Sequence, residues 1–129
     1  SRTSNVPDVL KAISPPLEQR NAWAQERLNQ LASDLDQVIQ LSAACMQLAE
    51  KAARKQSALQ KFDQTQAKVR PIMRRIPPLN LMTQKGIRHA IAEGQQAQTI
   101  QQSMRANRNL YAVIHDGCRQ LRDAIPSSD

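Results

Sequence analysis

The chain has 129 residues, a formal net charge of +7 and only three aromatic side chains, one each of Trp, Tyr and Phe. This length allows one domain with a modest core, and the shortage of rings argues against a globule built around aromatic residues. Leu, Ile, Ala and Met with seventeen Gln and only three Gly are instead typical of long helices that pack along apolar stripes. Because β-branched residues never alternate over the length of a strand, we expect an all-α protein.

Residues 1–14 read as a polar leader that contains one short helix. Asn5 can cap this helix, and Pro7 is tolerated in its first turn. The residues Ser14, Pro15 and Pro16 then break the chain and cap the element that follows. The leader helix would carry one apolar face, made of Val6, Val9, Leu10 and Ile13.

The first long helix is predicted over about residues 15–70. From Leu28 onward, apolar side chains recur at alternating steps of three and four, and the resulting seam is wide enough for a bundle of three or more helices. The stripe thins at residues 52–57, where the helix is either continuous or hinged. The absence of Gly and Pro there favours a continuous helix.

Three of the seven prolines, Pro71, Pro77 and Pro78, lie close together and predict a corner over residues 71–79. Proline lacks the amide proton and clashes with the carbonyl one turn back, so a helix cannot pass smoothly through this stretch. We therefore predict a long antiparallel helical hairpin, or an elongated helical bundle with coiled-coil-like packing, that turns near residues 70–80.

The second long helix is predicted over about residues 80–125, with Asn80 or Thr83 as its cap. Gly94 weakens its first part, and whether the helix is continuous there is left open. Asn107 either fixes register in the seam or points to solvent while Leu110 packs in its place. The packing stripe of both helices comprises Leu28, Leu31, Leu35, Val38, Leu48, Ile100, Met104, Tyr111, Ile114, Leu121 and Ile125.

Two helices roughly 70 Å long cannot cover both apolar stripes in a two-helix hairpin. The apolar stripes must then be covered by a second copy, by a partner subunit, or by the same helices folded back at residue 54 and Gly94. In a hairpin that closes near residue 75, paired positions sum to about 150. Cys45 and Cys118 are then too far apart to bond, so we expect free buried thiols and a reducing compartment, the cytoplasm or the nucleus.

The positive charge is concentrated in the middle of the chain. Residues 51–88 carry ten Lys and Arg against Asp63 alone, a net charge of +9, whereas residues 1–50 carry −2 and residues 89–129 carry none. Nothing in helix stability requires this excess, so it suggests an anionic counterpart; the alternative is an ordinary solvated basic face. The predicted binding residues of this basic corner are Arg54, Lys55, Lys68, Arg70, Arg74, Arg75, Lys85 and Arg88.

No motif for catalysis, metal binding or phosphate cradling occurs. We therefore expect a non-enzymatic protein with no cofactor, metal or small-molecule substrate. It would be an interaction or scaffold module, a helical subunit or segment of a larger assembly whose basic corner contacts an acidic partner. The alternative is a self-contained bundle that binds nucleic-acid phosphates or an anionic membrane surface.

Overall fold

The predicted all-α fold is confirmed. The computed structural model describes residues 17–126, and every regular element among them is a helix. The predicted leader helix and the proposed helix start at Pro15 or Pro16 lie outside the described residues. The helices are α2 (Leu17–Ala52), α3 (Ala58–Met73), α4 (Leu81–Gln96) and α5 (Ile100–Ala124).

The chain divides into two compact units between Gln30 and Leu31. In the first unit the side chains of residues 18–30 are all exposed, including Trp23 at 46% and Leu28 at 40% of their full surface. The second unit contains the rest of α2 together with α3, α4 and α5, and these segments pack as a helical bundle.

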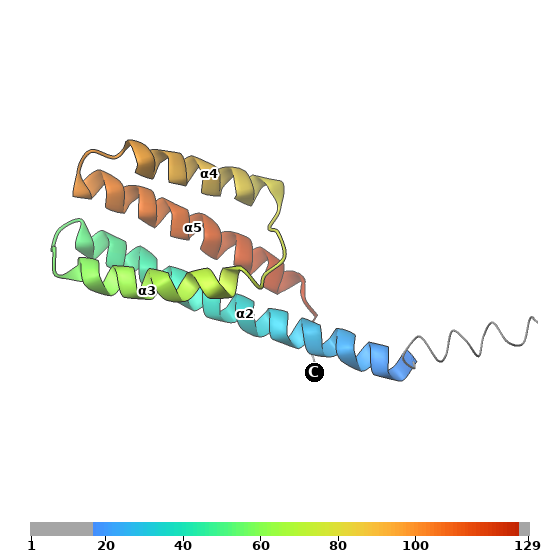
Figure 1. Ribbon diagram of the computed structural model, residues 1–129. Coiled ribbons are helices and arrows are strands. Elements are labelled where there is room, and N and C mark those ends of the chain that lie inside the picture. The colour runs from blue at the N-terminus through green and yellow to red at the C-terminus, as the bar shows by residue number, and fades with distance from the viewer. Residues whose placement is uncertain (1–16, 127–129) are drawn as a thin grey trace, which may run out of the picture. The chain divides into compact units, whose positions relative to one another are not determined.

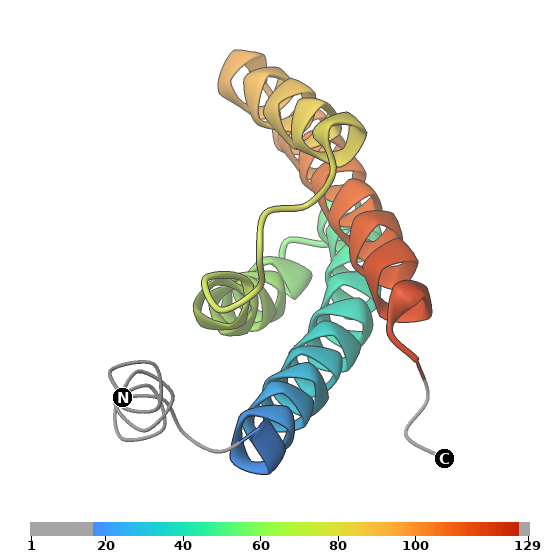
Figure 2. The same cartoon turned by 90° about the vertical axis from the view of Figure 1, so that its right-hand side faces the viewer.

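Within the second unit, successive helices run in opposite directions (Figure 1). The α2–α3 connection, residues 53–57, and the α4–α5 connection, residues 97–99, lie at one end, called here the turn end. The α3–α4 connection, residues 74–80, lies at the opposite end, called here the corner end. Figure 2 looks along the helices and shows α4 beside α5 and α3 beside α2.

The prediction of one continuous helix over residues 15–70 is wrong, because the chain folds back after Ala52. The turn is made by main-chain bonds alone, with the Arg54 amide donating to Lys51 at 3.0 Å and the Ala58 amide to Lys55 at 3.1 Å. Folding back buries Phe62 and Val69 to 1% and 2% exposure. Burial of side chains of this size contributes about 1.5–3 kcal/mol each, more than the roughly 1 kcal/mol of each helical hydrogen bond lost in the turn.

The prediction of one helix over residues 80–125 is also wrong, because the chain reverses at residues 97–99. The expected cap at Asn80 is confirmed, since its side chain accepts a hydrogen bond from the Thr83 amide at 2.8 Å. Thr99 caps α5 in the same way through the Gln102 amide at 3.1 Å. The second cap stabilises a new helix start that the apolar pattern alone did not indicate.

The corner begins later than predicted, because α3 continues through Pro71 to Met73. The φ angle that the Pro71 ring fixes suits a helix. Because α3 ends within one turn of Pro71, few backbone hydrogen bonds are disturbed. Ile72, Ile76 and Leu79 are each 8% exposed and close this end of the core. Their burial secures the connection that carries Pro77 and Pro78 to α4.

Helix α5 joins the other three helices of the bundle. Its Arg108 and Arg122 form ion pairs with Glu50 and Asp36 of α2 at 2.6 and 2.9 Å, and the residue numbers of both pairs sum to 158. The antiparallel register expected from the sequence therefore holds between α2 and α5, displaced by a few residues. The Tyr111 ring packs edge-to-face on Phe62 of α3, with ring centroids 6.0 Å apart.

Gly86 and Gly117 lie where α4 and α5 pack tightly against each other. A Cβ at Gly117 would be 2.5 Å from Cγ2 of Thr83, and one at Gly86 would be 2.9 Å from Cγ1 of Val113. Ordinary carbon contacts are about 3.5–4.0 Å, so neither site admits a side chain without movement. These residues, which weaken isolated helices, allow the two helices to pack closely.

The packing stripe is covered mainly by the chain itself, which is the third of the arrangements considered from the sequence. Asn107 donates to the Ser103 carbonyl of its own helix at 2.9 Å, while Leu110 packs against the core. Cys45 and Cys118 are free and buried. Of the predicted stripe, Leu35, Val38, Met104, Tyr111 and Ile114 are buried, Leu31, Leu48, Leu121 and Ile125 are partly buried, and Leu28 and Ile100 are exposed.

Candidate partner-binding surfaces

The eight cations predicted to form one basic corner are all exposed, but they do not gather at one place. Arg54 and Lys55 lie in the α2–α3 connection at the turn end. Helix α3 separates them from the corner end by its 16 residues, about 24 Å at helical rise. The fold-back after Ala52 therefore removes two members from the expected cluster. The others are Lys68, Arg70, Arg74 and Arg75 at the end of α3 and Lys85 and Arg88 in the first two turns of α4.

Arg75 has a structural contact of its own. Its Nη2 donates to Oδ1 of Asp34 at 2.9 Å and its Nε donates to Oδ2 at 3.3 Å, while the Asp34 side chain is only 2% exposed. These hydrogen bonds and the attraction of the carboxylate raise the pKa of the Arg75 guanidinium above its ordinary value. The pair fastens the corner to α2, so Arg75 belongs to the scaffold rather than to a contact surface.

The middle of α3 is held against α5 by a polar contact. The Tyr111 hydroxyl donates to Oε1 of Gln66 at 2.9 Å. Burial raises the pKa of this hydroxyl, and the charge of Arg70 acts in the opposite direction. Arg70 thus lies close enough to the α3–α5 junction to affect Tyr111 while remaining exposed itself.

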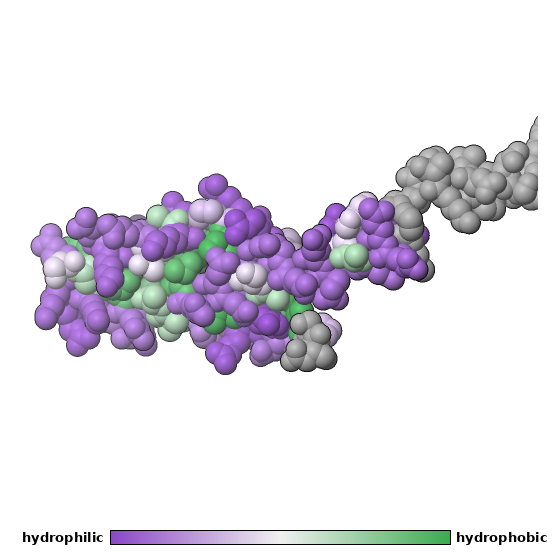
Figure 3. Space-filling model, turned by 90° about the horizontal axis from the view of Figure 1, so that it is seen from below, coloured by the Kyte–Doolittle hydropathy of each residue, from purple (hydrophilic) through white to green (hydrophobic). Residues whose placement is uncertain are grey.

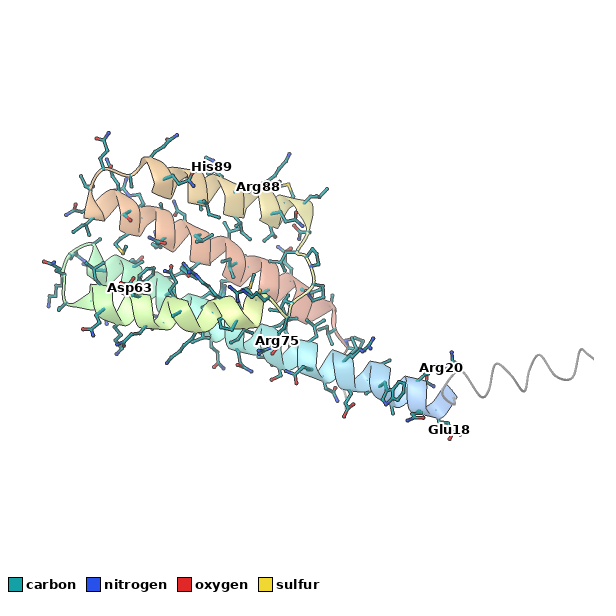
Figure 4. The ribbon with its side chains drawn as sticks, in the orientation of Figure 1. Glu18, Arg20, Asp63, Arg75, Arg88 and His89 are labelled. Carbon is teal, nitrogen blue, oxygen red and sulfur yellow. The ribbon has the colours of Figure 1, made fainter. Side chains whose placement is uncertain are left out.

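Two large apolar side chains are exposed where the corner leads into α4. Leu81 is 74% exposed and Met82 is 81% exposed. Ile72, Ile76 and Leu79, which precede them closely in the sequence, are buried instead. Figure 4 shows Arg75 just after the end of α3 and Arg88 on α4. We define the corner surface as Lys68, Arg70, Arg74, Leu81, Met82, Lys85 and Arg88.

The corner surface carries positive charge that is not balanced locally. Across residues 31–126 there are fourteen Lys and Arg against seven Asp and Glu. The ion pairs that Lys and Arg form among the described residues involve Arg75, Arg108 and Arg122, and none involves a cation of the corner surface. Figure 3 shows one face of the molecule, where polar side chains border a strip of apolar ones.

A second surface, not predicted as a site, lies at the turn end between α2 and α5. It is a groove of about 400 Å³ with an apolar floor and three arginines. The Nε of Arg108 contacts Oε1 of Glu50 at 2.6 Å, and both side chains are close to half exposed. The antiparallel register of α2 and α5 could have indicated this groove from the sequence, since residues near 50 face residues near 105. The groove, called here the turn-end groove, is lined by Ala49, Glu50, Ala53, Arg54, Gln101, Met104, Arg105 and Arg108.

Comparison with known proteins adds no identification. No family model matches the chain, and neither the curated proteins nor the solved structures contain a significant match to it. Among the helices of residues 17–126, none is both long and apolar enough to cross a bilayer.

Proposed function

We propose that this chain is a non-enzymatic protein-interaction module that binds an acidic helical segment of a partner protein on the corner surface. The observation that carries the proposal is the exposure of Leu81 and Met82 on α4, together with five exposed cations of α3, the corner and α4 that lack carboxylate partners within the described residues. In this function the rest of the bundle is a scaffold that holds the surface in place, as a segment of a larger assembly.

The apolar pair supplies the affinity in this proposal. Full burial of a Leu or Met side chain contributes about 1.5–3 kcal/mol. Because Leu81 and Met82 are adjacent on α4, they lie about 100° apart around the helix and present a broad apolar area rather than a single point. An amphipathic helix with apolar residues on one face is a common occupant of such a surface.

The cations supply charge complementarity. Positive groups around an apolar centre favour a segment rich in Asp and Glu, increase its association rate and disfavour basic segments. The corner surface has no aromatic side chain for base stacking, and the only ring on α3, Phe62, is buried. This distribution supports an acidic protein segment over single-stranded nucleic acid.

A direct test uses a designed helical peptide with Leu on one face and Glu on the other, titrated into the isotope-labelled protein. We expect amide shifts confined to residues 68–74 and 81–88. A peptide in which Lys replaces every Glu should not bind. Shifts spread evenly over all exposed amides would contradict a defined binding surface.

A charge variant tests the location of the site. Replacing Arg74, Lys85 and Arg88 with Gln keeps good helix formers at these positions and should weaken peptide binding at least about tenfold, the effect expected for contact residues. Leu81→Ser combined with Met82→Ser should weaken it by a similar factor. Arg75 is left intact in both variants because its loss would disturb Asp34.

The matched control neutralises three lysines at the turn end, Lys51, Lys55 and Lys61, which are also exposed. Replaced with Gln, they should leave binding of the acidic peptide nearly unchanged at physiological salt. An equal loss in both triple variants would show that net charge alone drives binding. In that case duplex nucleic acid or anionic vesicles should compete with the peptide, and the corner surface would not be a protein site.

A further inference from the structure

We infer that the turn-end groove is a binding site for a phosphate monoester carried on a protein side chain, such as phosphoserine. This site lies at the opposite end of the bundle from the corner surface and is independent of it. The inference rests on three guanidinium groups that line one groove, on the carboxylate that engages one of them, and on the apolar floor between them.

The positively charged side chains that line the groove are all of one kind. All three cations are arginines, although lysines lie nearby in the sequence. Guanidinium groups are planar forks that bind phosphate oxygens in pairs, whereas Lys acts as a point charge. Arg54 and Arg105 take part in none of the ion pairs found among residues 17–126, so both are available to a ligand.

Glu50 has a defined part in this arrangement. Its Oε1 forms an ion pair with Nε of Arg108 at 2.6 Å, and the two terminal nitrogens of that guanidinium remain outside the contact. Three arginines and one glutamate give the groove a formal charge of +2. A phosphate monoester carries about −1.5 to −2 near neutral pH, so it can neutralise the groove, whereas a single carboxylate cannot.

The size and the floor of the groove suit a side chain rather than a free ion. A volume of about 400 Å³ is much larger than one phosphate group. The floor contains Ala49, Ala53 and the buried Met104. These apolar atoms would contact the methylene group and the flanking backbone of a phosphorylated segment, while the arginines at the rim hold the phosphate.

The test compares three short peptides that differ at one central position, which is phosphoserine, serine or glutamate. Titration into the isotope-labelled protein should give binding of the phosphoserine peptide with shifts at residues 49–54 and 101–108. We expect the serine peptide not to bind and the glutamate peptide to bind at least about tenfold more weakly, because it offers one negative charge. Equal affinity for the glutamate and phosphoserine peptides would overturn the inference.

Variants and pH provide separate checks. Arg54→Gln and Arg105→Gln should each weaken binding at least about tenfold, whereas Arg119→Gln, an exposed arginine of α5 outside the groove, should not. The groove lining contains no histidine, so affinity should fall about tenfold from neutral pH to about pH 5 as the phosphate takes up its second proton. A pH-independent affinity, or equal loss in Arg119→Gln, would refute a defined phosphate site.

Inorganic phosphate serves as the last probe. It should bind far more weakly than the phosphoserine peptide, because it makes no use of the apolar floor. If inorganic phosphate binds as tightly as the peptide, the assignment to a phosphorylated side chain is wrong. Circular dichroism of each variant should show unchanged helix content, since Arg54 and Arg105 are exposed.

Discussion

The closest approach between α4 and α5 gives a quantitative prediction with an internal control. Gly117 and Gly94 both lie within helices that contact each other, but their surroundings differ. A Cβ at Gly117 would be 2.5 Å from Cγ2 and 2.9 Å from Oγ1 of Thr83, whereas a Cβ at Gly94 would be 3.7 Å from the Cβ of Ala106. The first substitution creates an overlap, and the second creates an ordinary contact.

The magnitudes follow from two opposing effects. Replacing a helical Gly with Ala is worth about 0.8–1.0 kcal/mol through helix propensity, and this gain applies to both sites. Overpacking typically costs about 1–3 kcal/mol and applies only to Gly117→Ala. Thr83 cannot easily turn away because a β-branched side chain in a helix has few rotamers. Helix propensity cancels when the two variants are compared. The free energy of unfolding of Gly94→Ala should therefore exceed that of Gly117→Ala by about 1–3 kcal/mol.

Urea unfolding followed by circular dichroism measures both free energies of unfolding. Gly94→Ala should exceed the parent protein in stability, and Gly117→Ala should fall below it or match it. Adding Thr83→Ala removes the two overlapping atoms, so the double variant should recover most of the loss, with a coupling energy of about 1–3 kcal/mol. If Gly117→Ala is as stable as Gly94→Ala, α4 and α5 do not approach each other as described.

Three further predictions concern the core and its charges. Leu35→Ala, at a fully buried position, should lower the free energy of unfolding by about 2–5 kcal/mol in urea titrations, and a loss below 1 kcal/mol would contradict its burial. Burial raises the pKa of Cys45 and of Cys118 to about 11. In the unfolded chain these thiols ionise near pH 9, so their contribution to stability is complete below that pH. The free energy of unfolding should then fall as the pH rises from about 9 toward 11. The fall should be smaller when both cysteines are replaced with Ala. Arg75→Met should destabilise the protein more than Asp34→Ala in thermal melts, because only the first leaves a buried carboxylate without its guanidinium partner, and the reverse order would show that the pair is dispensable.

The sequence by itself determined the helical class and several helix boundaries, because these depend on local chemistry. Asn80 can accept a hydrogen bond from the third amide after it wherever the chain goes, and the prolines near residue 77 exclude a continuing helix. The alternating stripe identified Leu35 and Ile114 as core positions, since apolar periodicity reflects which face of a helix must leave water. The antiparallel pairing of α2 with α5 also followed from the position of the corner.

Only the tertiary structure decided where the long helices break and what their polar residues do. Residues 53–57 contain no Gly or Pro, and the turn there is favoured because Phe62 and Val69 gain a core to pack against, a gain that no local pattern displays. That reversal moved Arg54 away from the corner and into the groove with Arg105. The same reversal also brought Arg75 within reach of Asp34, with which it pairs. Charge counts along a chain cannot separate such residues, because a cation's role depends on which carboxylates the fold brings within reach of it.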